Sequence, residues 1–370
     1  MGNVGKPRER KGVENYYFGG SGTEETLRAN KRAWEFFALR PRVLAAPKTV
    51  NLGTVILARP VPSPIVVAPM AYLSLLEDDG ELIMARRAAK SGFSFCLSMR
   101  SAVPLEKVAT VFFANLAKQD SQCRPLLLFQ LYLLRDRGIS ESLARRARAA
   151  GFDGLVVTVD TPYLGLRRRD RLNQFVVPEK FRTANITDEL SLRSQTTSED
   201  GTVSAFGVSF ESNITSYAQD PTATWQDVAN FRNEFPQWPI VLKGVSQVHD
   251  LSSSSEISDG VIISNHGGRQ LDGSVSTAVV LMELGILDVA KSLTLMVDGG
   301  VDSGADVVRA QCLGADAVLI GRFFAKALFR SGEAGLKLAM MTIKEETWLA
   351  MNFLGAPNRE SLDRSLIRFP

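Results

Sequence analysis

A histidine and an arginine follow an apolar run in the stretch VIISNHGGRQLDG (261–273), at His266 and Arg269. The chain contains two histidines, so one of them stands beside a cation at the end of an expected strand. An imidazole that exchanges its proton near neutral pH can act as a base. A histidine that serves only the structure, with its hydrogen bonds satisfied, is the alternative for His266 taken alone.

Almost every apolar run of the chain ends in a polar or charged residue. In chain order these strand-end residues are Ala71, Ser98, Gln130, Tyr132, Thr158, Asp160, Lys243, His266, Arg269, Asp298 and Arg322. Core packing does not require polar groups there, whereas a pocket lined by them would suit a polar ligand. Each residue taken singly has a plainer interpretation: Asp160 before Thr-Pro can form a turn, and Lys243 can be a solvated charge.

The elements that must position these residues are short apolar runs separated by helical patterns. The runs cover 64–70, 93–98, 125–132, 154–160, 239–244, 260–265, 294–300 and 317–322. Unbroken apolar runs are typical of parallel strands buried on both faces. Eight such units with intervening helices in about 250 residues predict an α/β fold of the TIM (β/α)8 barrel type, with a doubly wound sheet as the competitor. In a barrel, the carboxyl ends of all strands meet on one rim.

Three segments do not fit the repeat. Residues 1–60 form an N-terminal extension, residues 110–124 lengthen one link from helix to strand, and residues 162–222 are long and polar. A long loop after the fourth strand of a barrel is typically a lid. We therefore expect residues 1–370 to form a single domain, with 162–222 as its lid or insert.

Glycines near the end of the chain indicate a phosphate site. In DGGVDSGADVVRA (298–310) and in GRFFAKAL (321–328), glycines stand between an expected strand and an expected helix. Backbone N–H groups at such helix starts, here around Gly300 and Gly321 and assisted by Arg322, can hold a phosphate. Ordinary turns are the alternative for these glycines.

Composition excludes several other classes of function. The net charge is +3 and no basic run is interleaved with aromatics, so we expect no nucleic-acid partner; the cluster RRRDR (167–171) is by default a solvated loop. The three cysteines are scattered without CxxC spacing, so neither a metal site nor disulfides are expected. No apolar run is long enough for a membrane span. The polar N-terminus does not resemble a secretory signal, and a reducing, cytoplasmic location is expected.

Taken together, the motifs SNHGGRQLDG, VTVDTP, FQLY, LKG and DGGV followed by LGADAVLIGR resemble the FMN-dependent L-2-hydroxy acid oxidising family. That family includes glycolate, lactate and mandelate or hydroxymandelate oxidases, and the resemblance extends over nearly the whole chain. It implies an FMN cofactor and oxidation of a small L-2-hydroxy acid to the 2-oxo acid. It leaves open the substrate side chain and the electron acceptor, which could be oxygen, a quinone or a protein. Members often form homotetramers.

The resemblance also implies a role for each matching residue. His266 matches the base, Asp160 the carboxylate paired with it, and Tyr132 a tyrosine near the substrate hydroxyl. The residues that match the groups holding the substrate carboxylate are Tyr16, Arg167 and Arg269. The expected FMN contacts are Ala71, Ser98, Gln130, Thr158, Lys243, Ser264, Asp298, Gly300, Gly321 and Arg322. The chemistry agrees, because a planar guanidinium binds a carboxylate well and a carboxylate stabilises an imidazolium once it forms.

Two residues depart from the family pattern. Asp302 occupies the place of an arginine that contacts the FMN phosphate, and a carboxylate there should repel the phosphate. The alternative is that Asp302 turns outward and that Ser303 or a group from the serine-rich segment at 246–260 donates instead. Weaker retention of FMN is expected. Arg100 falls where a pocket aromatic often stands, and it either faces the side-chain end of the substrate or points to solvent.

Two other functions remain open at this point. A flavin barrel of another reaction class, such as a type 2 isopentenyl diphosphate isomerase, would share much of the pattern. Alternatively, a non-catalytic paralogue could have kept the barrel while losing its hold on the cofactor, with Asp302 as the supporting residue.

Overall fold

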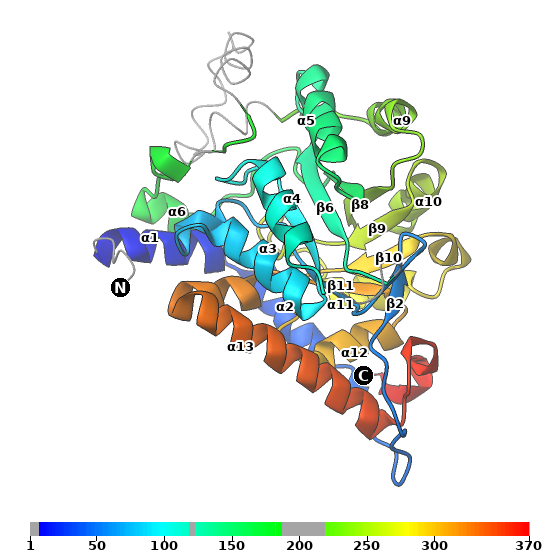
Figure 1. Ribbon diagram of the computed structural model, residues 1–370. Coiled ribbons are helices and arrows are strands. Elements are labelled where there is room, and N and C mark those ends of the chain that lie inside the picture. The colour runs from blue at the N-terminus through cyan, green and yellow to red at the C-terminus, as the bar shows by residue number, and fades with distance from the viewer. Residues whose placement is uncertain (1–6, 118–122, 182, 187–218, 370) are drawn as a thin grey trace.

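Eight parallel strands close into a barrel at the centre of the protein, in the order β10-β11-β4-β5-β6-β7-β8-β9 (Figure 1). The computed structural model describes residues 7–117, 123–181, 183–186 and 219–369. The strands are β4 (Ile65–Val67), β5 (Ser94–Ser98), β6 (Leu127–Tyr132), β7 (Gly154–Thr158), β8 (Ile240–Val245), β9 (Gly260–Ile263), β10 (Thr294–Val297) and β11 (Ala317–Ile320). One strand falls in each predicted apolar run. Because β4 pairs with both β5 and β11, the sheet closes, which confirms the barrel and excludes the doubly wound alternative.

Helices follow the strands and surround the barrel (Figure 1). They are α3 (Gly80–Ser91), α4 (Leu105–Ala114), α5 (Arg137–Ala149), α9 (Trp225–Glu234), α10 (Val248–Ile257), α11 (Thr277–Leu284), α12 (Gly304–Cys312) and α13 (Arg322–Leu354). Local sequence sets several ends: Thr224 and Ser303 form capping boxes at the starts of α9 and α12, and Gly92 ends α3 in the left-handed conformation. The long helix α13 is kinked at Ser331 and Gly332.

The N-terminal extension closes one end of the barrel. A hairpin of β2 (Thr54–Ile56) and β3 (Arg59–Val61) contributes Ile56 and Val61 to the cluster that fills the barrel interior. The Leu57 N–H donates to Thr294 Oγ1 at the start of β10 (3.0 Å), so the hairpin covers the amino ends of the strands. The hairpin does not cover the opposite end of the barrel, where the carboxyl ends of the strands meet and the candidate site residues lie.

Two N-terminal helices lie near that opposite end. Helix α1 (Pro7–Phe18) packs on α13 and on the short helix α6 (Arg168–Asn173), and α2 (Glu25–Glu35) packs on α11. Strand β1 (Ala38–Leu39) pairs with β12 (Ile367–Arg368) and so ties the two ends of the chain together. Three-residue 3-10 turns occupy Leu73–Leu75, Glu179–Phe181, Arg359–Ser361 and Arg364–Leu366, and a longer one Asp288–Ser292.

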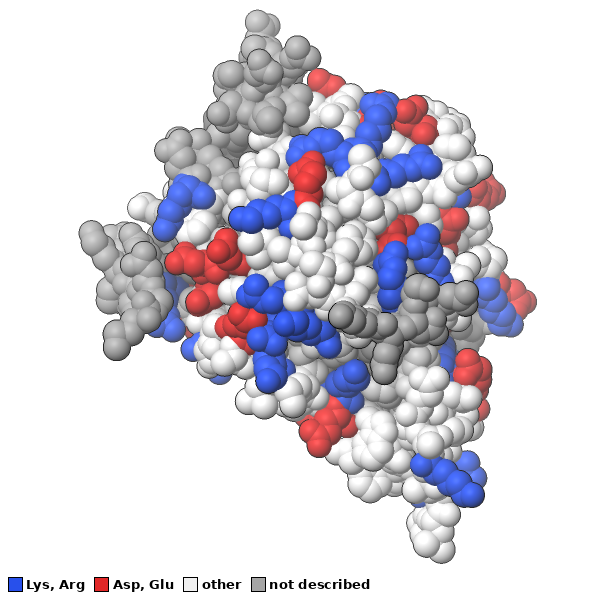
Figure 2. Space-filling view, in the orientation of Figure 1, with Lys and Arg blue, Asp and Glu red and all other residues white. Residues whose placement is uncertain are grey.

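The irregular segments differ in part from expectation. Residues 110–114 belong to α4, so the link predicted at 110–124 is shorter than expected, and residues 118–122 within it lie outside the described part. The predicted lid covers residues 162–222. Residues 182 and 187–218 of this segment also lie outside the described part of the chain. Within the described residues, no helix is long and apolar enough to cross a membrane. Basic and acidic side chains are intermixed on the face shown in Figure 2.

Candidate active site

A cavity of about 1140 Å³ opens at the carboxyl ends of the barrel strands. The predicted site residues that line it are Tyr16, Ala71, Ser98, Gln130, Tyr132, Thr158, Arg167, Lys243, His266, Arg269, Asp298, Gly300, Gly321 and Arg322. Two predicted residues lie behind the wall instead: Asp160 contacts His266, and Ser264 contacts Lys243. The parallel topology thus gathers residues that are far apart in the sequence.

His266 is held against a carboxylate by a tight turn after β9. Its Nδ1 lies 2.9 Å from Asp160 Oδ1, and its backbone N–H donates to Ser264 Oγ (3.0 Å). The backbone is in the left-handed region at both His266 (φ 57°) and the following Gly267 (φ 64°). A larger residue at position 267 would be strained at this φ, and its Cβ would stand 2.4 Å from Arg322 Nη2, so glycine is favoured there.

The electrostatics of this pair favour a neutral imidazole beside an ionised carboxylate. Burial alone would raise the pKa of Asp160, but His266 and Lys243 hold it at about 2. Burial, reinforced by Lys243, lowers the pKa of His266 below its usual 6.5, although Asp160 opposes this shift. An ionised carboxylate only accepts hydrogen bonds, so Nδ1 carries the proton and Nε2 is the acceptor.

Two arginines are stacked around one tyrosine at the mouth of the cavity. The Cζ atoms of Arg269 and Arg167 lie 5.1 and 5.9 Å from the ring centroid of Tyr16. Arg269 Nη1 donates to the backbone carbonyls of Tyr16 and Gly19. Burial and then Arg269 lower the pKa of Arg167 to about 10. Arg167 Nε is buried without a partner among the described residues, so the pair can bind an anion.

The default interpretation of RRRDR as a solvated loop is correct only in part, because Arg168, Arg169 and Arg171 are exposed whereas Arg167 and Asp170 are not. Its residues 168–171 are in helix α6, and the side chains of Arg167 and Asp170 are 16% and 8% exposed. Asp170 Oδ2 lies 3.8 Å from Arg167 Nη1, and burial raises the pKa of its carboxyl. Tyr16 packs on Phe175 (5.5 Å between centroids), which helps to bury this segment under α1.

A row of polar side chains runs around the rim from β5 to β10. Gln130 bridges Ser98 and Thr158 through hydrogen bonds of 3.1 Å each. Lys243 Nζ donates to Ser264 Oγ (2.8 Å) and lies 3.1 Å from Asp298 Oδ2. Burial alone would lower the pKa of Lys243, but Asp298 and Asp160 raise it. The amine therefore stays protonated at neutral pH.

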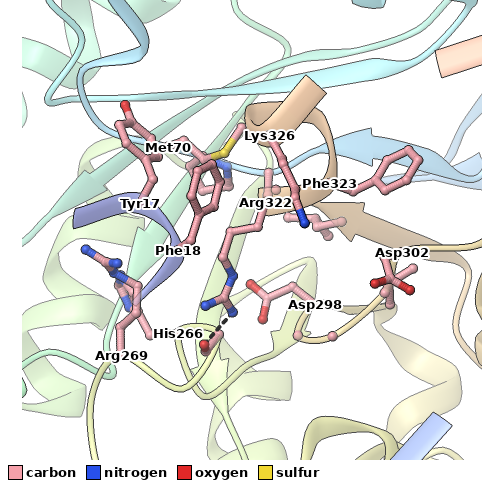
Figure 3. A pocket seen from close by; sticks show the side chains of 18 of the residues that line it. Tyr17, Phe18, Met70, His266, Arg269, Asp298, Asp302, Arg322, Phe323 and Lys326 are labelled. Carbon is pink, nitrogen blue, oxygen red and sulfur yellow. Dashed lines mark hydrogen bonds between the residues drawn. The ribbon is translucent and has the colours of Figure 1, made fainter. Parts of the chain in front are cut away.

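Arg322 and Asp298 offer buried atoms that a ligand could satisfy. Figure 3 shows the Arg322 guanidinium extended towards the loop that carries His266, where it donates to the Gly267 carbonyl. Its Nη1 atom and Asp298 Oδ1 are buried without partners among the described residues. An unsatisfied donor and acceptor beside glycine turns and the start of α13 fit a ligand with a phosphate and hydroxyl groups, as FMN has.

Asp302 forms an ion pair with a lysine on α2 at this end of the cavity. Its Oδ2 accepts from Lys31 Nζ on α2 (2.8 Å), and the two side chains are 41% and 63% exposed. The Ser303 hydroxyl is bonded to Asp306 (2.8 Å) within the cap of α12. An exposed pair of this kind offsets the charge of the carboxylate only in part, and the bond to Asp306 already engages the Ser303 hydroxyl proton.

Sequence reasoning missed several residues that position the site. Asn30 on α2 exchanges two hydrogen bonds of 2.8 Å with Asn265, which fixes the loop that carries His266. The Tyr17 hydroxyl donates to Tyr72 O (2.7 Å). Asp170 could have been found from its i,i+3 spacing to Arg167. Asn30, Tyr17 and Lys31 belong to no local sequence pattern that would indicate a role in the site.

The solvent-facing interpretation of Arg100 is wrong. Its side chain lines the cavity, with Cζ 5.3 Å from the ring centroid of Tyr132. Burial raises the pKa of Tyr132, and Arg100 partly offsets this rise.

Comparison with known proteins identifies the family of the chain. The family model described as FMN-dependent dehydrogenase matches residues 6–369. An L-lactate oxidase of Nostoc sp. is 36% identical, over 95% of this chain and 92% of that protein. A 4-hydroxymandelate oxidase of Amycolatopsis orientalis is 37% identical, over 93% and 90% respectively. A solved mandelate oxidase structure with (S)-4-hydroxymandelic acid superposes with a TM-score of 0.83 at 36% identity, covering 98% of this chain and 97% of that one.

Proposed function

The chain belongs to the FMN-dependent dehydrogenase family, and we propose that it oxidises its substrate with His266 as the base and Arg269, Arg167 and Tyr16 as the carboxylate-binding group. The resemblance seen in the sequence is confirmed, and with it the FMN cofactor and the oxidation of an L-2-hydroxy acid to the 2-oxo acid. The isomerase-like alternative loses its support. The observation that carries the proposal is a histidine paired with an aspartate at 2.9 Å, beside a cavity lined by that histidine and by two partly buried arginines.

The buried arginines orient the substrate. A 2-hydroxy acid carries a carboxylate next to the reacting carbon, and a planar guanidinium binds it through two parallel hydrogen bonds. Arg269 is fixed by the Tyr16 and Gly19 carbonyls, so its orientation is set before the substrate arrives. Arg167 adds a second cation whose charge only Asp170 partly offsets. This arrangement would place the substrate hydroxyl near His266 and Tyr132.

His266 then takes the hydroxyl proton at Nε2. The imidazolium that forms faces the ionised Asp160 at 2.9 Å, which stabilises the charge. FMN, when bound, supplies the acceptor for the two electrons and the hydrogen that leave the α-carbon. The side chains suited to the flavin ring are Ser98, Gln130, Thr158 and Lys243, with Ser264 behind Lys243. Asp298 suits a ribityl hydroxyl, and Gly300, Gly321 and Arg322 suit the phosphate. Ala71 lines the cavity beside them.

The pH dependence of flavin reduction should report His266. A base works when neutral, so the second-order rate constant of reduction should fall as pH drops through its pKa. Because burial and Lys243 lower that pKa, the midpoint should lie below 6.5, with a plateau at neutral pH. Asp160→Asn removes a group that raises the pKa and should move the midpoint further down. Anaerobic stopped-flow absorbance between pH 5 and 8 measures both; a wild-type midpoint above 6.5 would contradict the assignment.

Retention of FMN should depend on the Lys31–Asp302 pair. Lys31→Gln leaves the Asp302 carboxylate unbalanced at the phosphate end, so FMN should dissociate about twofold to fivefold more readily, the range expected of an exposed ion pair. Asp302→Arg should tighten FMN, and the wild type should lose part of its flavin on dialysis. Fluorescence titration of the apoprotein with FMN measures the dissociation constants.

The controls separate this effect from a general loss of charge. Lys291→Gln removes a lysine from another exposed pair, with Asp288, and should leave FMN binding unaltered. The double variant Lys31→Gln/Asp302→Asn should recover most of the affinity. Equal FMN dissociation constants for the wild type, Lys31→Gln and Asp302→Arg would mean that this pair does not act on the phosphate.

The proposal also covers the acceptor that reoxidises the flavin and the oligomeric state of the protein. We take oxygen as the first acceptor to test, with a quinone or a protein as alternatives, and admission of air to the reduced protein distinguishes them by the rate of reoxidation. We propose a single domain over residues 1–370 from the repeat of βα units, and a homotetramer from the family resemblance. Light scattering on the holoprotein tests the tetramer.

A further inference from the structure

Arg100 is fixed in the backbone just beyond the end of β5. Its N–H donates to Ser98 Oγ (3.2 Å), and its carbonyl accepts from the Tyr72 N–H (3.1 Å). Both contacts lie on the rim where the strands end. These contacts fix the backbone at the rim, and the side chain lines the cavity from there.

The guanidinium of Arg100 lacks a counterion among the described residues. Its nearest described aromatic neighbour is Tyr132, whose ring centroid lies 5.3 Å from Cζ, and Nη2 is buried without a hydrogen-bond partner in that part of the chain. A cation–π contact compensates for only part of the loss of water around a cation. A buried donor without an acceptor calls for a ligand that supplies one.

Four other cations that line the cavity already have assignments. Lys243 is paired with Asp298, Arg322 suits the phosphate, and Arg269 with Arg167 suits the substrate carboxylate. Arg100 lies close enough to Arg167 to contribute to lowering its pKa, after burial and Arg269. A substrate with one carboxylate would leave this third guanidinium unmatched.

We propose that Arg100 binds a second anionic group at the side-chain end of the substrate, so that the preferred substrate is a dicarboxylic L-2-hydroxy acid. The inference rests on the proposed function and specifies its substrate class. Arg100 lines the same cavity as His266 and as the arginines assigned to the first carboxylate. A diacid bound there would have one carboxylate on Arg269 and Arg167 and the other on Arg100.

The test compares acids of equal chain length. The holoenzyme is mixed without oxygen with L-malate or L-2-hydroxybutyrate, and with L-2-hydroxyglutarate or L-2-hydroxyvalerate, and the second-order rate constant of flavin reduction is measured. At least one of the diacids should be favoured over its monoacid by about tenfold or more, as expected of a charge-assisted contact. Arg100→Met should lower that ratio by about tenfold, and Arg100→Lys should lower it less.

A binding measurement provides a second readout. The 2-oxo diacid 2-oxoglutarate and its monoacid counterpart 2-oxovalerate are titrated into the oxidised holoenzyme, and the flavin spectrum reports their dissociation constants. The wild type should bind the diacid more tightly, and Arg100→Met should lose this preference. An unchanged FMN content shows that the variant is folded.

The outcomes separate this inference from the function on which it rests. If monoacids or aromatic acids reduce the flavin as well as the diacids, or if Arg100→Met leaves the ratio unchanged, the inference is overturned while the oxidation of 2-hydroxy acids stands. If no 2-hydroxy acid reduces the flavin, the proposed function fails, and the binding titration still decides whether Arg100 selects a diacid.

Discussion

Replacing His266 with alanine should leave FMN bound but slow flavin reduction by about 10²- to 10⁴-fold, the range a positioned base contributes. The imidazole is the group placed to take the hydroxyl proton, and Asp160, 2.9 Å from its Nδ1, stabilises the cation that forms. Without the ring, the proton would have to pass to water. The measurement is the rate constant of anaerobic flavin reduction at saturating substrate.

The second histidine of the chain provides a matched control. His249 lies on α10 and is exposed, so His249→Ala should reduce its flavin at the wild-type rate. Near-normal reduction in His266→Ala would remove His266 from the role of base. Loss of FMN from that variant would instead indicate that the loop after β9 had been disturbed, and the ratio of flavin to protein distinguishes these results.

The second large effect concerns Arg269. Arg269→Lys should raise the substrate dissociation constant by about 10- to 100-fold, because an ammonium cannot reproduce the two parallel hydrogen bonds of a guanidinium. Arg269 also binds the carbonyls of Tyr16 and Gly19, so its loss loosens the end of α1 beside the cavity. The concentration dependence of the reduction rate gives the dissociation constant.

A surface substitution shows whether the effect is specific. Arg145 forms exposed pairs with Glu141 and Glu234 on the outside of the barrel, and Arg145→Lys should leave the dissociation constant unaltered. An unchanged half-saturation concentration for every acid tested with Arg269→Lys would mean that Arg269 does not bind the substrate carboxylate.

The barrel could be predicted because its signal is local. Runs such as GLVVT at β7 are apolar up to the threonine that ends the strand and are buried at every position, as parallel strands covered on both faces require. The rim residues followed from the same reasoning, since polar groups directly after such runs must meet at one end. His266, Lys243 and Asp298 were found in this way.

The contacts that tune the site could not be predicted because they join distant segments. Asn30 and Asn265 are 235 positions apart, and Lys31 and Asp302 are 271 apart. The charge run at 167–171 suggested an exposed loop, and only its position under α1 buries Arg167 and Asp170. In the same way, the sequence allowed two directions for Arg100, and the structure places its side chain in the cavity, over the Tyr132 ring.

The account is tested most directly by mixing the purified holoenzyme with a panel of L-2-hydroxy acids in the absence of oxygen. We expect the oxidised flavin absorbance to be lost with at least one L acid but not with its D enantiomer, with one equivalent of 2-oxo acid formed for each flavin reduced. A protein that holds stoichiometric FMN and stays oxidised with every L-2-hydroxy acid would contradict the account.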